Sequence, residues 1–99
     1  MDQADIFKAL SNKTRLQILQ WLKDPDLHFS PQERDMKEFG VCVGKIQEKV
    51  QLTQSTVSEY LSILQRTGLI ESMRVGQWTY YKRNEDAMRK LKEQLDSEL

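Results

Sequence analysis

The chain has 99 residues, and its fifteen basic and fifteen acidic side chains give a formal net charge of zero at pH 7. This length suits one small domain, because domains commonly contain about 100–150 residues. No stretch approaches the ~20 apolar residues of a membrane span and the N-terminus lacks a signal-peptide pattern, so we expect no membrane association. Cys42 is the only cysteine. It cannot form an internal disulfide, which favours a reducing cytoplasm.

The charges are distributed slightly unevenly along the chain. Residues 1–23 and 53–83 each carry four basic and two acidic side chains. Residues 24–52 carry four basic and six acidic side chains, and residues 84–99 carry three and five. Non-specific DNA binding scales with the number of phosphates that a protein neutralises. We therefore expect no strong general attraction for a polyanion, and only a mildly basic segment at 53–83.

Two helices are predicted at the start of the chain. The first, about residues 3–10, is indicated by three apolar residues, Ile6, Phe7 and Leu10. Asn12 is a good N-cap for a second helix, which must end near Pro25 because proline cannot continue it. Trp21 in this helix is expected in the core or in an interface, since aromatic side chains dominate burial.

Residues 24–40 form an unusually long connection. Helix–helix connections commonly span about 2–8 residues, so this one is either functional or locally structured. Ser30-Pro31-Gln32-Glu33 matches a capping box with proline at the first helical position, which predicts one or two helical turns there. His28 is the only histidine. We expect a solvated or hydrogen-bonded loop residue rather than a metal ligand, because no second ligand lies at a suitable spacing.

The next segment has the pattern of a helix-turn-helix. A β-prone run, Val41-Cys42-Val43, precedes a helix predicted over about residues 45–50. A turn of three or four residues leads to a second helix at about 54–67, which Thr53 can cap and Gly68 can close. Its apolar stripe consists of Val57, Leu61 and Leu64. The opposite face begins with small polar residues, as a helix that enters the DNA major groove requires. An ordinary amphipathic surface helix is the alternative.

The residues after Gly68 change to a β pattern. Two β-prone runs, 69–75 and 78–83, flank Gly76-Gln77 and predict a hairpin over about 69–83. A helix-turn-helix followed directly by a hairpin is the winged-helix arrangement. The predicted fold is therefore mainly α with a small β-hairpin, in a single winged helix-turn-helix domain over residues 1–99.

A last helix is predicted over about residues 85–98, with Asn84 as its cap. Met88, Leu91, Leu95 and Leu99 recur at helical spacing and form a narrow seam of the kind that pairs helices. We expect a homodimer through the terminal helices at about 3–10 and 85–98. The expected interface residues are Ile6, Leu10, Met88, Leu91 and Leu95. Packing of this seam within one chain is the alternative.

Three motifs over nearly the whole chain resemble the arsenic-repressor (ArsR/SmtB-type) family of winged-helix transcriptional regulators. Residues 7–19 resemble the family opening "ALADPTRLRIL". Residues 52–61, with Leu64 and 68–70, resemble "LSQSTVSQHLKVLREAGLV". Residues 74–77, with Tyr80 and Tyr81, resemble the family wing "RxGRxxYY".

The resemblance implies a homodimer that binds an operator of two inverted half-sites in double-stranded DNA and represses until an unknown inducer binds. In the predicted recognition helix the groove-facing candidates are Gln54, Ser55, Thr56, Ser58, Glu59 and Tyr60. The wing candidates for the DNA backbone or minor groove are Arg74, Gln77 and Trp78.

The chain departs from this family at two of the candidate positions. Glu59-Tyr60 replaces the usual glutamine–histidine pair, and Gln77 replaces the usual wing arginine. Glutamate accepts from cytosine N4 but is repelled by nearby phosphates. We therefore expect an altered operator sequence and a smaller dependence of binding on salt than in an arginine-rich relative.

The family's metal-sensing positions are also changed. Cys42-Val43-Gly44 resembles the family's Cys-Val-Cys sequence, but Gly44 replaces the second cysteine. Asp86 matches a second family metal position, and no histidine follows it. A lone thiolate cannot form the multi-ligand site of a thiophilic metal, so we expect no metal and no cofactor. Cys42 is either a thiol sensor or a small buried apolar residue. The 24–40 connection, with His28 and Phe29, is a candidate inducer site.

Two other classes of function remain to be compared with a DNA-binding repressor. A winged-helix protein–protein interaction module is compatible with the zero net charge and with Glu59. An enzyme is not expected, because the sequence has no nucleophile–base constellation and no glycine-rich phosphate loop.

Overall fold

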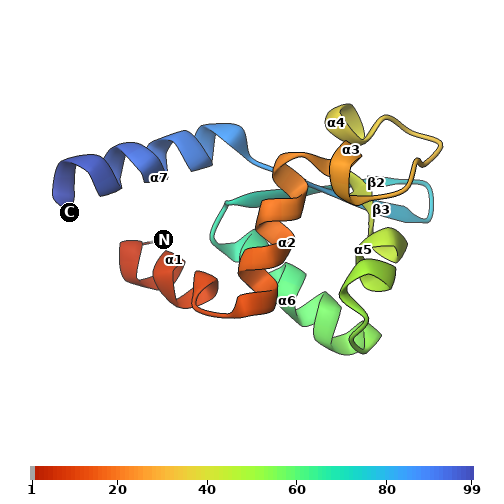
Figure 1. Ribbon diagram of the computed structural model, residues 1–99, viewed down its shortest axis with the longest axis horizontal. Helices are drawn as coiled ribbons and strands as arrows, with labels where there is room; N and C mark the ends of the chain where they lie inside the picture. Colours follow the sequence, from red (N-terminus) through yellow and green to blue (C-terminus); the bar gives the residue numbers. More distant parts are fainter. Residues whose placement is uncertain (1) are drawn as a thin grey trace.

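The computed structural model describes residues 2–99, which form a mainly helical winged helix-turn-helix with a small antiparallel sheet (Figure 1). The helices are α1 (Gln3–Leu10), α2 (Lys13–Lys23), α3 (Pro25–His28), α4 (Met36–Phe39), α5 (Val43–Val50), α6 (Gln54–Arg66) and α7 (Glu85–Glu98). The strands are β1 (Val41–Cys42), β2 (Ile70–Val75) and β3 (Trp78–Arg83).

The first two helices begin where the sequence places their caps. The Asp2 side chain accepts a hydrogen bond from the Asp5 backbone N–H at the start of α1. Asn12 Oδ1 accepts from the Arg15 N–H at 3.0 Å at the start of α2. Each bond satisfies a donor that the helix itself leaves unpaired. The end of α2 at Lys23 follows from Pro25, as the sequence predicts.

The 24–40 connection contains two helical turns, but not where the sequence predicts them. Pro25 opens α3, and His28 is its last residue rather than part of a loop. Asp35 caps α4 by accepting from the Glu38 N–H. Ser30–Glu33 is not helical, so the prediction from the capping-box pattern was wrong.

The physical reason is the bonding of Gln32. Its side-chain Nε2 donates to the Gly40 carbonyl at 2.8 Å and its Oε1 accepts from the Cys42 N–H at 3.0 Å. These two bonds hold the middle of the 24–40 connection against the start of β1. We call this pair of bonds the Gln32 bridge.

The sheet has one strand more than the predicted hairpin. β2 and β3 pair antiparallel from Ile70↔Arg83 to Val75↔Trp78, and the short β1 pairs with the other side of β3 through Val41↔Tyr81. The strand order is β1-β3-β2. Gly40 precedes β1 with a φ of 96°, and a Cβ there would lie 2.6 Å from the Tyr81 carbonyl oxygen. Only glycine therefore allows β1 to approach β3 this closely.

The core lies between α2, α5, α6 and the start of the wing. Its fully buried side chains are Ile18, Val41, Ile46, Val57, Leu61, Leu64, Leu69 and Ile70. Because α6 contributes three of these, its rotation about its own axis is fixed by packing. At the other end of the molecule α7 extends from the body alongside α1 (Figure 1).

Candidate nucleic-acid interface

The turn between α5 and α6 depends on one residue in an uncommon backbone conformation. Gln51 caps α5 with φ 61° and ψ 33°, the left-handed region that glycine or asparagine usually occupies. Two residues later Thr53 Oγ1 accepts from the Thr56 N–H at 3.2 Å and starts α6. α5 begins at Val43, two residues before the sequence predicts. Together α5, the turn and α6 form the helix-turn-helix.

The outward face of α6 is polar and lies opposite Val57, Leu61 and Leu64. Its exposed residues are Gln54, Ser55, Ser58, Glu59 and Ser62. Within residues 2–99 the side chains of Gln54, Ser58 and Glu59 form no hydrogen bond or ion pair. These groups are therefore free to bind an external partner along the first two turns of the helix.

Three of the six candidate residues on α6 are engaged within the chain. The Ser55 hydroxyl lies 3.4 Å from Thr53 Oγ1 but is exposed. Thr56 is half-buried, and its Oγ1 accepts from Thr53 Oγ1 at 2.8 Å. Tyr60 is also half-buried, with its ring 5.2 Å from the Arg15 guanidinium carbon and its hydroxyl 3.4 Å from Asn12 Nδ2. Tyr60 thus points toward α2 and not outward with Glu59. The sequence gives no local sign of this contact, because Arg15 and Tyr60 are far apart along the chain.

The wing candidates lie at the hairpin tip. Arg74 Nε donates to the Gly76 carbonyl at 3.2 Å, and Gln77 is exposed. Trp78 is 54% exposed, which is unusual for so large an apolar side chain. The hairpin tip and the start of α6 both lie at the end of the molecule away from α1 and α7 (Figure 1). Both elements can therefore approach one ligand surface.

A cavity of about 600 Å³ lies beside the wing. Residues 32–34, the start of α5 and β3 line it, and among its side chains are Cys42, Trp78 and Tyr80. Small-molecule sites commonly measure about 300–1,000 Å³. Cys42 is half-buried, and its side chain forms no hydrogen bond that caps α5. In residues 2–99 no three histidine, cysteine or acidic side chains come together in a way that could hold a metal ion.

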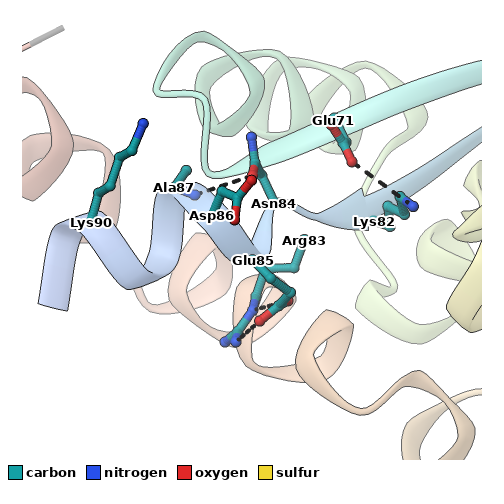
Figure 2. Close-up of a pocket in the computed structure, with 8 residues that line it drawn as sticks. All are labelled: Glu71, Lys82, Arg83, Asn84, Glu85, Asp86, Ala87 and Lys90. Atoms are coloured by element: carbon teal, nitrogen blue, oxygen red, sulfur yellow. Dashed lines mark hydrogen bonds and ion pairs between the residues drawn. The ribbon is translucent and has the colours of Figure 1, made fainter.

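A second depression of about 610 Å³ lies where β3 meets α7 (Figure 2). Arg83, whose side chain is 8% exposed, binds both carboxylate oxygens of Glu85, at 2.6 and 2.8 Å. The hydrogen bond from Arg83 lowers the pKa of Glu85, and the positive charge of Arg83 acts in the same direction. Asn84 Oδ1 caps α7 by accepting from the Ala87 N–H. These contacts fix the direction in which α7 leaves the wing.

The expected dimer residues divide into two groups. Ile6 and Leu91 are buried in the core of the single chain. Leu10, Met88 and Leu95 are half-buried at the edge of that core. Phe7 of α1 is exposed.

The sequence has relatives among known regulators. Residues 40–72, from β1 through the helix-turn-helix into β2, match the family model described as "Bacterial regulatory protein, arsR family". The chain is 56% identical to the uncharacterized HTH-type transcriptional regulator YbzH of Bacillus subtilis (strain 168), over the full length of both chains. The chain belongs to the arsR family. Members of this family are transcriptional regulators with a DNA-binding winged helix-turn-helix, and not enzymes.

Two further relatives of this arsR-family chain extend the comparison. The transcriptional repressor SdpR of Bacillus subtilis (strain 168) is 31% identical over 80 residues, which is 81% of this chain and 73% of SdpR. The solution structure of Mb0332 from Mycobacterium bovis, described as a homodimeric winged helix-turn-helix DNA-binding domain, has a TM-score of 0.65 and 30% identity. That match covers 90% of this chain and 70% of the Mb0332 chain. No helix within residues 2–99 is long and apolar enough to cross a membrane.

Proposed function

We propose that this arsR-family protein is a homodimeric transcriptional repressor that acts in the cytoplasm. Each protomer inserts α6 into a major groove of an inverted-repeat operator and places its wing against the flanking DNA backbone or minor groove. An inducer releases the repressor from DNA. The observation that carries the proposal is the outward face of α6. It is exposed and polar, and its Gln54, Ser58 and Glu59 side chains are unpaired, while the opposite face is packed in the core.

The chemistry of this face suits the reading of base edges. A B-DNA major groove is about 12 Å wide and admits one α-helix. Gln54 can bond an adenine edge twice, donating from its amide NH2 to N7 and accepting at its amide oxygen from N6, and Ser55 and Ser58 can donate to or accept from any base. Glu59 accepts from cytosine N4. Cytosine at the position that Glu59 faces is therefore the expected feature of the operator.

The electrostatics predict weak dependence on salt. Phosphate contacts contribute a slope of about −0.9 each to the logarithm of affinity against the logarithm of salt. The wing offers Arg74 but has Gln77 where the resemblance leads us to expect arginine, and the net charge of the chain is zero. A steep slope in a salt titration of operator binding would contradict this expectation.

The dimer is proposed to form through α1 and α7. An inverted-repeat site requires two recognition helices related by twofold symmetry. One chain leaves four apolar side chains of α1 and α7 exposed or only half-buried, namely Phe7, Leu10, Met88 and Leu95. A single domain of this size buries a limited part of its apolar surface, so a partner that covers these side chains adds stability.

The DNA-binding assignment is tested by selection from a random pool of duplexes, followed by a binding titration. Replacing both Ser55 and Ser58 by alanine should weaken binding of the selected duplex about tenfold or more, because each lost base contact costs ~1–3 kcal/mol. The melting temperature should hardly change, since exposed substitutions stay within ~0.5 kcal/mol. Ser97→Ala, also an exposed helical serine but on α7, is the matched control. Equal loss of stability and binding would mean that the two serines face inward.

The dimer assignment is tested by sedimentation of Leu95→Glu. A charge on the half-buried Leu95 should convert dimers to monomers, because an unpaired charge is costly to bury. Leu27→Glu is the control, since Leu27 is 76% exposed and lies on α3. A Leu95→Glu variant that stays dimeric at the wild-type concentration range would exclude α7 from the interface.

The inducer is proposed to bind in the cavity beside the wing. This cavity touches the 24–40 connection, the start of α5 and β3, so a ligand there contacts the wing and the helix that precedes α6. A thermal-shift screen with metabolites, metals and thiol reagents tests the site, with Trp78→Ala as the variant that should lose the shift. If a thiol reagent is the inducer, Cys42→Ser should bind the operator normally and no longer be released. If the reagent still releases the Cys42→Ser variant from the operator, the Cys42 thiol is not the group that senses it.

A protein–protein interaction module is the second candidate, because Glu59 sits in the middle of the proposed DNA surface of a neutral protein. A wild-type protein that selects no duplex and shifts no DNA from its own promoter region would favour this candidate. The same polar face of α6 would then be the surface to test for a protein partner.

A further inference from the structure

One arginine connects three helices that the proposed function treats separately. Arg15 lies in the first turn of α2. Its Nε donates to the Ala9 carbonyl at 2.6 Å, and a terminal nitrogen lies 3.4 Å from the Lys8 carbonyl. Both carbonyls belong to the last turn of α1. The Lys8 carbonyl also accepts from the Ser11 N–H and the Ser11 hydroxyl, whereas the short bond to the Ala9 carbonyl comes from Arg15. A cation at this end of a helix is also favoured by the helix dipole.

The same guanidinium contacts the recognition helix. Its central carbon lies 5.2 Å from the centroid of the Tyr60 ring, within the ~6 Å over which a cation is attracted to an aromatic face. Asn12 completes the set, since its Oδ1 accepts from the Arg15 N–H and its Nδ2 lies 3.4 Å from the Tyr60 hydroxyl. We call these three side chains, Asn12, Arg15 and Tyr60, the clasp.

The clasp lies where the packing of α1 against α6 leaves an open space. A cavity of about 290 Å³ lies beside it and is lined by residues of α1, of α6 and by Arg15 itself. Ile63 of α6 and Thr67, the C-cap residue of α6, line this space. The planar guanidinium of Arg15 contacts both helices beside this space, bonding carbonyls of α1 on one side and the Tyr60 ring of α6 on the other.

We propose that the clasp is a positioning device, which sets the angle between α1 and α6 and thereby the spacing of half-sites that the dimer accepts. This inference rests on the proposed function, in which α1 belongs to the dimer interface and α6 reads DNA. One added base pair moves a half-site by about 3.4 Å and turns it by roughly 35°. A dimer with a rigid connection from α1 to α6 cannot follow that change, whereas a loosened one can.

The test compares operators that differ only in spacing. Wild-type protein first selects an inverted repeat from random duplexes, which is then remade with spacers one base pair shorter and one or two longer. We expect the wild type to prefer its own spacing by about tenfold or more, as an orientation-dependent complex should. Arg15→Gln should reduce that preference to about threefold or less, while binding of a single half-site and the salt slope stay unchanged.

Matched variants separate the clasp from loss of charge and loss of fold. Lys13→Gln removes the same charge from an exposed position in the same turn and should keep the spacing preference. Tyr60→Phe should keep most of it, because the ring face remains, and Tyr60→Leu should lose it. If Arg15→Gln does not fold, Arg15→Lys serves instead, since lysine keeps the charge without the planar fork.

Each result decides between defined alternatives. A spacing preference retained in Arg15→Gln overturns the positioning role. Equal weakening at every spacing with a lower melting temperature assigns Arg15 to stability alone. A smaller salt slope, or relaxed preference at one base pair, assigns it to direct DNA contact. A wild-type protein that selects no duplex overturns the proposed function and the spacing role together, which distinguishes it from the other results.

Discussion

Gly40→Ala should be among the most damaging single-methyl changes in this chain. The glycine has φ 96° and ψ −176°, a region that only glycine commonly occupies, and forcing another residue there costs about 1–3 kcal/mol. The new Cβ would lie 2.6 Å from the Tyr81 carbonyl oxygen and 2.7 Å from its carbon. Moving β1 away from β3 to relieve this contact costs about 1–3 kcal/mol more, as overpacking in a core does. We expect a total loss of about 4 kcal/mol.

Gly44→Ala is the matched control for this prediction. Gly44 lies in α5, a Cβ there would meet nothing within 4 Å, and its φ is not positive. Alanine should therefore be neutral or stabilise the protein by up to about 1 kcal/mol, because it favours the helix.

The measurement is urea unfolding at one fixed protein concentration, since dimerisation would make the midpoint depend on concentration. A slope of ~1–3 kcal/mol per molar urea converts the expected loss into a shift of the midpoint of about 2 M. Gly40→Ala unfolding within about 0.5 kcal/mol of the wild type, the range of ordinary surface changes, would refute the reasoning. It would mean that β1 is not held against β3 as described.

Two further predictions concern stability. Gln51→Gly should stabilise the protein by about 0.5–1 kcal/mol in urea unfolding, because glycine adopts the left-handed conformation without steric cost. Glu48→Gly, one turn earlier in α5, should destabilise it by a similar amount. If both variants change the free energy of unfolding in the same direction, the turn geometry described here is contradicted. The hydrogen bond from Arg83 lowers the pKa of Glu85 in the folded state, so its stabilisation is present above the unfolded pKa and is lost as the pH falls through the folded value. Glu85→Gln should therefore be less stable than the wild type at pH 6, by about 1 kcal/mol or less for so exposed a carboxylate, and equally stable near pH 2. If the difference in stability between the two proteins does not change with pH, ionisation of Glu85 does not stabilise the fold.

The long elements could be predicted from sequence because their signals are repeated. α6 and α7 carry apolar residues at helical spacing together with cap residues at Thr53 and Asn84, and the hairpin has two β-prone runs around Gly76. The short elements could not be predicted in this way. α3 and α4 have four residues each, too few to form without tertiary contacts, so the Ser30-Pro31 pattern carried little information. β1 has two residues, and its pairing partner lies far along the chain.

The helical period was enough to predict which residues of α6 face outward and which face the core. The period separates Val57 from Ser55 and Glu59, which the structure places on opposite faces. It does not fix a residue on the flank of the helix. Tyr60 lies there, and its orientation depends on Arg15 and Asn12, which no local pattern connects to α6. The left-handed conformation of Gln51 likewise has no signal in the sequence, because glycine or asparagine is the usual residue at such a position.

The Gln32 bridge affects how this sheet meets other chains. β1 is an outer strand, and the outward-pointing N–H and C=O groups of such a strand are ready to pair with an extended segment of another molecule. The Gln32 amide presents one donor and one acceptor in the same arrangement as the backbone of a neighbouring strand, and it occupies the Gly40 carbonyl and the Cys42 N–H. A single side chain thereby closes this edge against edge-to-edge aggregation. The chain therefore needs no additional strand to cover the edge at β1.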